Sequence, residues 1–303
     1  MPSQPSHTDT LILTACWIAA VRARESEHAD RLFHDPWAAG LAGEEGTAWR
    51  QRMTGGKDEN EVGLAIRTRF FDDFLLEVTR QHAVCQVVIA AAGMDTRAFR
   101  LTWPPHTRLF ELDLPPIFVR KEPLLATAVA VPTCQRHVVS VDLSDASWVD
   151  AVHQAGFDPG QRMVWLLEGL LFYLPAEVVT SLFERITALS VLGSWLGCEL
   201  KNTAMLTSPH TRSWIELLAR EGAAWISSID EPEAFLAARG WRARVDEPGE
   251  EGCILDAGCC LSSHARSQMC HAPFSSQFSV ASHESLFSGN HLFSGRSLLG
   301  SGK

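Results

Sequence analysis

The residues of this sequence best suited to hold a ligand are a turn of small side chains and an acidic residue twenty positions after it. The turn, Ala91-Ala92-Gly93, follows the apolar run 87–90 and precedes the charged residues 95–97. Small residues let the main chain approach a ligand closely, and the start of a following helix offers unpaired N–H groups. An ordinary connection between a buried strand and a helix would have the same pattern.

Asp113 is the acidic residue, and it closes a second predicted strand at 109–112. Glu111 and Asp113 lie on one face of this strand, because side chains alternate with a period of two. In a Rossmann-like fold an acid at this place binds both hydroxyls of a ribose. The dinucleotide pattern G-x-G-x-x-G is absent, since only Gly93 of it is present. We therefore expect a nucleoside ligand without phosphates, with S-adenosylmethionine as the candidate. A plain surface acid is the alternative for Asp113.

The elements that position these residues alternate between strands and helices. Apolar runs predict strands at 86–90, 109–112, 137–141, 163–167, 194–200, 241–245 and 277–281. The helical period predicts helices at 8–24, 31–42, 61–81, 116–126, 148–155 and 176–190, with shorter ones from about Thr96 and Glu231. The polar segment 44–60 contains Gly55-Gly56 and is predicted to be a loop. This order implies an α/β fold, a mostly parallel sheet with helices on both faces.

Candidate polar groups fall where four of the predicted strands end: Gly93, Asp113, Asp142 and Glu168. Ligands of parallel sheets bind beyond the carboxyl ends of the strands, so we expect these groups to share one site. Residues 202–223 predict a helical insertion over the strand ends, as a lid or a substrate wall. No histidine here has the context of a base, and no G-x-S-x-G pattern suggests a hydrolase.

The length and the composition fit one globular domain at 1–282. We expect an N-terminal helical part (1–82), a cofactor-binding core (83–200), and a lid with the last strands (201–282). The Ser- and Gly-rich end, 283–303, is expected to be a flexible tail.

Charge and cysteine usage narrow the class of partner. The net charge of −10 argues against nucleic acid, which needs a basic face. No apolar segment has the length of a membrane span. No secretion signal is recognised, so we expect a cytoplasmic protein whose eight cysteines are free thiols. The cysteines between 253 and 270 lack C-x-x-C spacing, so we expect no metal site. The oligomeric state is left open.

Several motifs occur in the order typical of one family. They are DRLFHDP (30–36), RTRFFDD (67–73), GMDTRAFR (93–100), ELDLP (111–115), VDL (141–143) and WLLEGLLFYL (165–174). The sequence resembles the leucine carboxyl methyltransferase family, in its bacterial-type small-molecule O-methyltransferase branch, over roughly 8–246. The family's turn usually reads Gly-Ala-Gly. This chain has Ala91 in place of the first glycine. The methyl group of Ala91 would crowd the ligand or require a φ that alanine disfavours.

The resemblance implies a Rossmann-like methyltransferase fold and a set of cofactor contacts. Asp142 and Leu143 resemble the adenine contact, with an ordinary helix cap as the alternative for Asp142. Arg67 resembles the arginine that holds the methionine carboxylate, a task suited to its fork of donors. Its alternative is a charge pair with Asp72 or Asp73. Glu168 matches a site residue, whereas Arg69 and the pair Asp95–Arg97 are expected to be structural.

The resemblance also implies the activity, an S-adenosylmethionine-dependent O-methyltransferase acting on a small molecule of the secondary-metabolite type. A carboxylate acceptor would give a methyl ester. The first alternative is a hydroxyl acceptor, which requires a general base, and Glu168 is then the candidate catalytic residue. The second alternative is a non-catalytic scaffold that only binds the cofactor.

Overall fold

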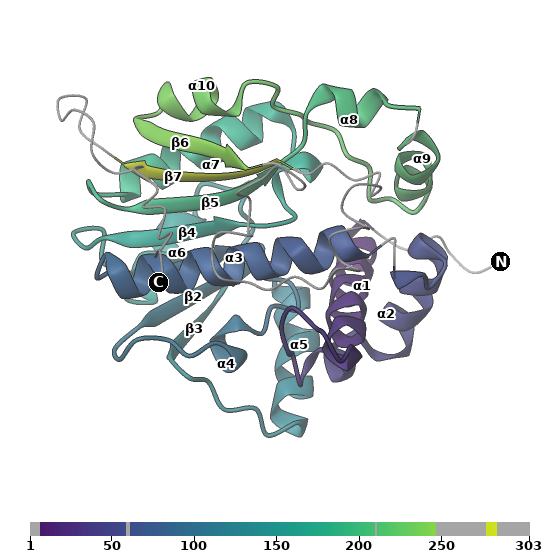
Figure 1. Ribbon diagram of the computed structural model, residues 1–303. Helices are drawn as coiled ribbons and strands as arrows, with labels where there is room; N and C mark the ends of the chain where they lie inside the picture. Colours follow the sequence, from purple (N-terminus) through teal and green to yellow (C-terminus); the bar gives the residue numbers. More distant parts are fainter. Residues whose placement is uncertain (1–6, 59–60, 210, 247–276, 284–303) are drawn as a thin grey trace, which may run out of the picture.

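A seven-stranded sheet lies between two layers of helices in the computed structural model, which describes residues 7–58, 61–209, 211–246 and 277–283 (Figure 1). The strand order is β3-β2-β1-β4-β5-β7-β6. β7 is antiparallel to both of its neighbours, whereas β1 to β5 pair in parallel. The strands are β1 (Gln86–Ala90), β2 (Arg108–Asp113), β3 (Gln135–Ser140), β4 (Met163–Leu167), β5 (Trp195–Leu200), β6 (Trp241–Asp246) and β7 (Gln277–His283). The predicted Rossmann-like, mostly parallel sheet is confirmed.

Alternate residues of the central strands bury against opposite helical layers. On β1, Val87 and Ile89 pack with the first layer, while Val88 and Ala90 pack with the second. The first layer contains α3 (Val62–Gln81), the short α4 (Arg97–Arg100) and α5 (Pro115–Thr127), and the second contains α6 (Trp148–Gln154), α7 (Ala176–Leu189) and α10 (Pro232–Ala237). Every residue of β1 and β4 is buried, because each strand has a neighbour on both edges and a helical layer on both faces.

The N-terminal helices differ from the prediction. α1 spans His7–Glu27 as expected, but α2 spans Ala38–Thr54, so the predicted helix at 31–42 starts later and the predicted loop at 44–60 is largely helical. A kink at Gly43 divides α2. Gly55, one of the two glycines that suggest a loop, is the C-cap that ends α2, whereas Gly46 inside the helix serves helix packing. A Cβ on Gly46 would lie 2.5 Å from the carbonyl oxygen of Cys16 on α1, so only glycine lets the two helices approach this closely.

The segment predicted as a lid, 202–223, packs on the N-terminal helices and not over the strand ends. Residues 202–223 do form two helices, α8 (Thr203–Thr207) and α9 (Arg212–Arg220). Leu218 of α9 and Ala223 pack on Trp17 of α1 and Trp49 of α2. Figure 1 shows α8 and α9 at the same end of the sheet as α1 and α2. The insertion therefore supports α1 from outside, and the helix that covers the strand ends is α1.

Some expectations concern residues outside the described ranges, namely the four cysteines between 253 and 270 and the tail from 284 onward. Cys16, Cys85, Cys134 and Cys198 are free thiols. The described ranges contain no group of three or more metal-ligating side chains with suitable geometry. Among the helices of these ranges, none has the length and hydrophobicity to cross a bilayer.

Candidate functional site

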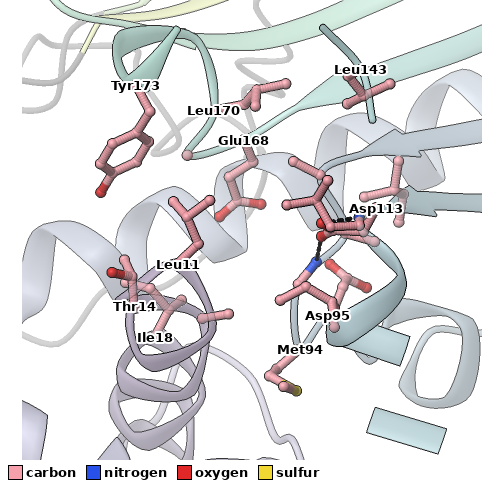
Figure 2. Close-up of a pocket in the computed structure, with 18 of the residues that line it drawn as sticks. Leu11, Thr14, Ile18, Met94, Asp95, Asp113, Leu143, Glu168, Leu170 and Tyr173 are labelled. Atoms are coloured by element: carbon pink, nitrogen blue, oxygen red, sulfur yellow. Dashed lines mark hydrogen bonds between the residues drawn. The ribbon is translucent and has the colours of Figure 1, made fainter. Parts of the chain in front are cut away.

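A cavity of about 630 Å³ lies where the carboxyl ends of β1 to β4 meet α1 (Figure 2). The strand order reverses between β1 and β4, and ligands of open parallel sheets bind at such a switch point. All six residues proposed from the sequence line this cavity: Arg67, Gly93, Asp113, Asp142, Leu143 and Glu168. The fold thus brings together side chains from α3 and from the ends of four strands.

The turn after β1 adopts the conformation that its small residues allow. Gly93 has φ of 48°, and Ala91 has φ of 58°, in the left-handed region that L side chains disfavour. A Cβ on Gly93 would lie 3.2 Å from the Cβ of Ala15, so α1 packs directly on the turn. The suspected strain at Ala91 is therefore present. A non-glycine residue in this region costs about 1–2 kcal/mol.

Asp113 closes the turn from the neighbouring strand. The backbone N–H of Gly93 donates to its Oδ2 at 2.6 Å, and that of Leu114 donates to its Oδ1 at 2.7 Å (Figure 2). Burial raises the pKa of Asp113 although both hydrogen bonds oppose the shift. Each carboxylate oxygen has two lone pairs, so both can still accept a ligand hydroxyl. A plain surface role is ruled out by this position inside the cavity.

Asp142 and Leu143 line the cavity beyond the end of β3. The backbone N–H and the hydroxyl of Ser144 both donate to Asp142 Oδ1, at 2.8 and 2.7 Å. Asp142 therefore caps a local turn, and the helix-cap alternative is wrong, because α6 begins only at Trp148. Leu143 is buried and Asp142 is exposed, so the pair offers an apolar surface beside a carboxylate.

Arg67 lies between two carboxylates, and the alternative of a surface pair with Asp72 or Asp73 is wrong. Its Nε is 2.8 Å from Oε1 of Glu168, and its Nη1 donates to Oε2 of Glu199 at 2.9 Å. Glu168 in turn contacts Nη1 of Arg97 through Oε2 at 2.8 Å. Among the described residues none accepts a hydrogen bond from Nη2 of Arg67, so one end of the guanidinium is left for a ligand.

Glu199 and Lys201 do not line the cavity but hold Arg67 from behind, and neither was predicted from the sequence. Glu199 is 1% exposed and accepts from Arg67, from the N–H of Gly169 at 3.0 Å and from Nζ of Lys201 at 2.7 Å. Burial opposes its ionisation, but Arg67 and Lys201 outweigh burial and hold the pKa of Glu199 at about 2. The sequence feature that could have pointed to Glu199 is its place as the single acid, near the end of the otherwise uncharged strand β5.

The residues after the turn form the expected local pair and a wider network. Arg97 contacts Asp95 at 2.6 Å, as predicted, and also Asp72 of α3 at 2.7 Å. Asp72 also binds Arg100 at 2.5 Å. The network ties the turn to α3 and orients Glu168 through Arg97. Arg69 pairs with its neighbour Asp73 at 2.7 Å, in keeping with the structural role predicted for it.

Tyr173, the one tyrosine of the chain, lines the cavity and was not among the site residues predicted from the sequence. It belongs to η2 (Leu171–Tyr173), and Figure 2 shows its ring pointing toward Leu11 and Thr14 of α1. Burial raises the pKa of Tyr173 to about 12, against a smaller lowering by Trp225. Its hydroxyl is therefore a neutral donor at physiological pH.

Comparisons with known proteins agree with these features. The model of the family "Leucine carboxyl methyltransferase" matches residues 15–187. Two relatives, from Parafrankia sp. and Saccharopolyspora erythraea, are both named "Putative S-adenosyl-L-methionine-dependent methyltransferase". They are 40% identical over 240 residues (76% of this chain and 76% of the relative) and 37% identical over 258 residues (78% and 85%). The crystal structure of a DUF574 family protein from Streptomyces avermitilis superposes with a TM-score of 0.63 at 14% identity, covering 87% of this chain and 96% of that one.

Proposed function

This protein belongs to the leucine carboxyl methyltransferase family, and from that premise we propose that it methylates a carboxylate of a small molecule to a methyl ester. The methyl donor is S-adenosylmethionine, the cofactor named for its relatives. The family gives the reaction class, and the cavity supports the more specific proposal.

The cavity offers suitable groups for each part of this cofactor. Asp113 would accept the two ribose hydroxyls, since its oxygens keep free lone pairs inside the cavity. Asp142 and Leu143 would bind adenine, through a carboxylate and an apolar surface. Nη2 of Arg67 would donate to the methionine carboxylate, and Gly93 would let the backbone approach.

One observation carries the choice of a carboxylate acceptor: among the described lining residues, each carboxylate either pairs with an arginine or is assigned to the cofactor, so none is left as a base. No histidine, lysine or cysteine is among its described lining residues. Both oxygens of Glu168 lie in ion pairs with Arg67 and Arg97, and those of Asp95 accept from Arg97. A hydroxyl acceptor needs a base to take its proton. A carboxylate has a reference pKa of about 4 and is already ionised, so it needs none.

The cavity also suits the change of charge in such a transfer. When bound, S-adenosylmethionine supplies an electrophilic methyl: a carboxylate oxygen forms the new O–C bond, and the S–C electron pair goes to sulfur. A cation and an anion are thereby converted into neutral products, and no proton is released. Apolar lining residues such as Leu11, Ile18 and Leu170 exclude water, which strengthens electrostatic interactions during the transfer. The residues of the chain mainly align and desolvate the two reactants.

Methyl-labelled S-adenosylmethionine incubated with a metabolite extract tests the proposal. We expect label in a small-molecule fraction that mild alkali releases as methanol, as an ester requires. The rate should stay flat between about pH 6.5 and 8.5, because the acceptor is ionised throughout. Label that survives alkali would indicate an ether and a hydroxyl acceptor. In that case Glu168→Gln should abolish turnover, whereas label that is retained but never transferred would indicate a binding protein without catalysis.

A further inference from the structure

The cavity has two ends of different character. Its polar end, at β1 to β3, carries Gly93, Asp113 and Asp142. Its other end lies between α1 and the segment that leads into α7, and the side chains there are apolar: Leu11, Ile18, Leu174 and Val178, with Pro175. Figure 2 shows Leu11 and Ile18 on α1 below Leu170 and Tyr173 on the segment after β4. The proposed cofactor contacts lie at the polar end, so the apolar end is left for the acceptor.

The charges around the cavity are already balanced. Four arginines line it, and each contacts a carboxylate of the protein: Arg22 contacts Asp35, Arg97 and Arg100 both contact Asp72, and Arg67 lies between Glu168 and Glu199. Each of these guanidinium groups therefore already has a carboxylate counterion, and the cofactor would use the remaining Nη2 donor of Arg67. No second cation is therefore left to neutralise an acceptor.

Tyr173 remains as a neutral donor at the apolar end. Its ring, like the side chain of Ile18, packs against the cluster that joins α1, α2 and α9. The other hydroxyl in view there, on Thr14, already donates to the carbonyl of Thr10 at 2.9 Å. A hydroxyl donor can hold one carboxylate oxygen and leave the other nucleophilic. An additional charge on the acceptor would be buried among apolar side chains without a partner, at a cost of several kcal/mol.

We propose that the acceptor is an apolar monocarboxylic acid, with its hydrocarbon part between α1 and the start of α7 and its carboxylate on the hydroxyl of Tyr173. This inference rests on the proposed carboxyl methylation and narrows its substrate class. It makes Tyr173 a specificity-determining residue, because the hydroxyl selects a single carboxylate and the surrounding side chains select its apolar body. Dicarboxylic and amino acids of the same length are excluded by their second charge.

The test compares wild-type enzyme and Tyr173→Phe on matched acids with methyl-labelled cofactor. The panel contains octanoic acid and phenylpropanoic acid, with suberic acid and phenylalanine as their doubly charged counterparts. We expect ester formation from the two apolar acids, with kcat/KM at least tenfold above their counterparts. Tyr173→Phe should lower kcat/KM for octanoic acid by about ten- to a hundredfold, the scale of a hydrogen bond to a charged group.

Cofactor affinity separates a specific effect from misfolding. Calorimetry with S-adenosylhomocysteine should give the same Kd for Tyr173→Phe and wild type. Thr79→Val is the control, because it removes a buried hydroxyl that bonds only within α3, outside the cavity, and it should leave kcat/KM unchanged.

Each adverse outcome has its own meaning. Equal or better esterification of the doubly charged acids, or an unchanged kcat/KM in Tyr173→Phe, overturns this inference while carboxyl methylation stands. Transfer to phenols or alcohols, with none to any acid of the panel, overturns both proposals. Absence of transfer to the apolar acids, with ester formed from another compound of an extract, overturns only the assignment of substrate class.

Discussion

Glu199→Gln is the change that tests most directly how the site is held together. Glu199 lies 132 residues after Arg67 in the sequence and is the acceptor for one end of its guanidinium. The substitution keeps the size of the side chain but removes its charge. Arg67 and Lys201 are then left buried, with Glu168 as a carboxylate shared between Arg67 and Arg97.

The magnitude follows from the electrostatics of this group. A pKa lowered from its ordinary value of 4.5 to about 2 corresponds to about 3 kcal/mol in favour of the ionised form. Breaking a buried ion pair by removing one partner typically costs about 3–5 kcal/mol. We therefore expect the free energy of unfolding to fall by about 3–5 kcal/mol. The Tm should fall by roughly 6–20 °C, at about 2–4 °C per kcal/mol for a large single domain.

Two measurements check this expectation. Calorimetric unfolding at neutral pH gives the loss of stability, and titration with S-adenosylhomocysteine gives the loss of affinity caused by a misoriented Arg67. The pH dependence has a defined sign, because the folded-state pKa of Glu199 is lowered. Its contribution is fully present above about pH 4.5 and is lost as the pH falls toward 2, so the difference between the two proteins should narrow in acid.

A matched control is Glu184→Gln, which neutralises an exposed glutamate of α7 and should change the Tm by less than a few degrees. An unchanged Tm in Glu199→Gln would show that the buried charges do not depend on this carboxylate. A large loss of stability with unchanged cofactor affinity would refute the view that Glu199 positions Arg67 for the ligand.

Three further changes test the turn, its acid and the helix that covers them. Asp113→Asn should weaken cofactor binding by about 1.5–3 kcal/mol in titration calorimetry. It should also lower the Tm, because the amide nitrogen of Asn cannot accept one of the two backbone N–H bonds; unchanged affinity in the folded variant would contradict the ribose assignment. Ala91→Gly should raise the free energy of unfolding in denaturant titrations by about 1 kcal/mol by relieving the positive φ, and a decrease would contradict strain there. Gly46→Ala should lower it by about 1–3 kcal/mol because its Cβ would meet the backbone of Cys16, whereas Gly40→Ala, with no atom within 4 Å, should not; equal effects would argue against tight packing.

Local patterns in the sequence determined the core of the sheet. β1 and β4 begin and end at the predicted residues, because a short, β-branched or aromatic apolar run followed by turn residues is typical of a strand buried on both faces. The residues after these strands were predictable as cavity residues for the same reason. Parallel strands in a βα order place their carboxyl ends at one edge, so Gly93, Asp113 and Glu168 had to lie close together.

The positions of α2 and of the insertion show where local patterns mislead. The polar segment 44–60 with Gly55-Gly56 predicts a loop, yet α2 continues to Thr54 and only its C-cap falls at Gly55. Gly46 is required by the closeness of α1, which no local pattern in α2 contains. Likewise, the sequence predicted the helices of 202–223 but not the face on which they pack, since that depends on the tryptophans of other elements.

Only the tertiary structure decided how the charges of the site are paired. From the sequence, Arg67 could equally have paired with Asp72 or Asp73, its neighbours on α3. The packing of α3 on the sheet directs it instead to Glu168 and Glu199, and gives Asp72 to Arg97 and Arg100. The physical reason is that a buried charge must be neutralised by whichever opposite charge the fold brings within contact. The period of a helix or a strand fixes the direction in which a side chain points, but the partner that it meets comes from another part of the chain.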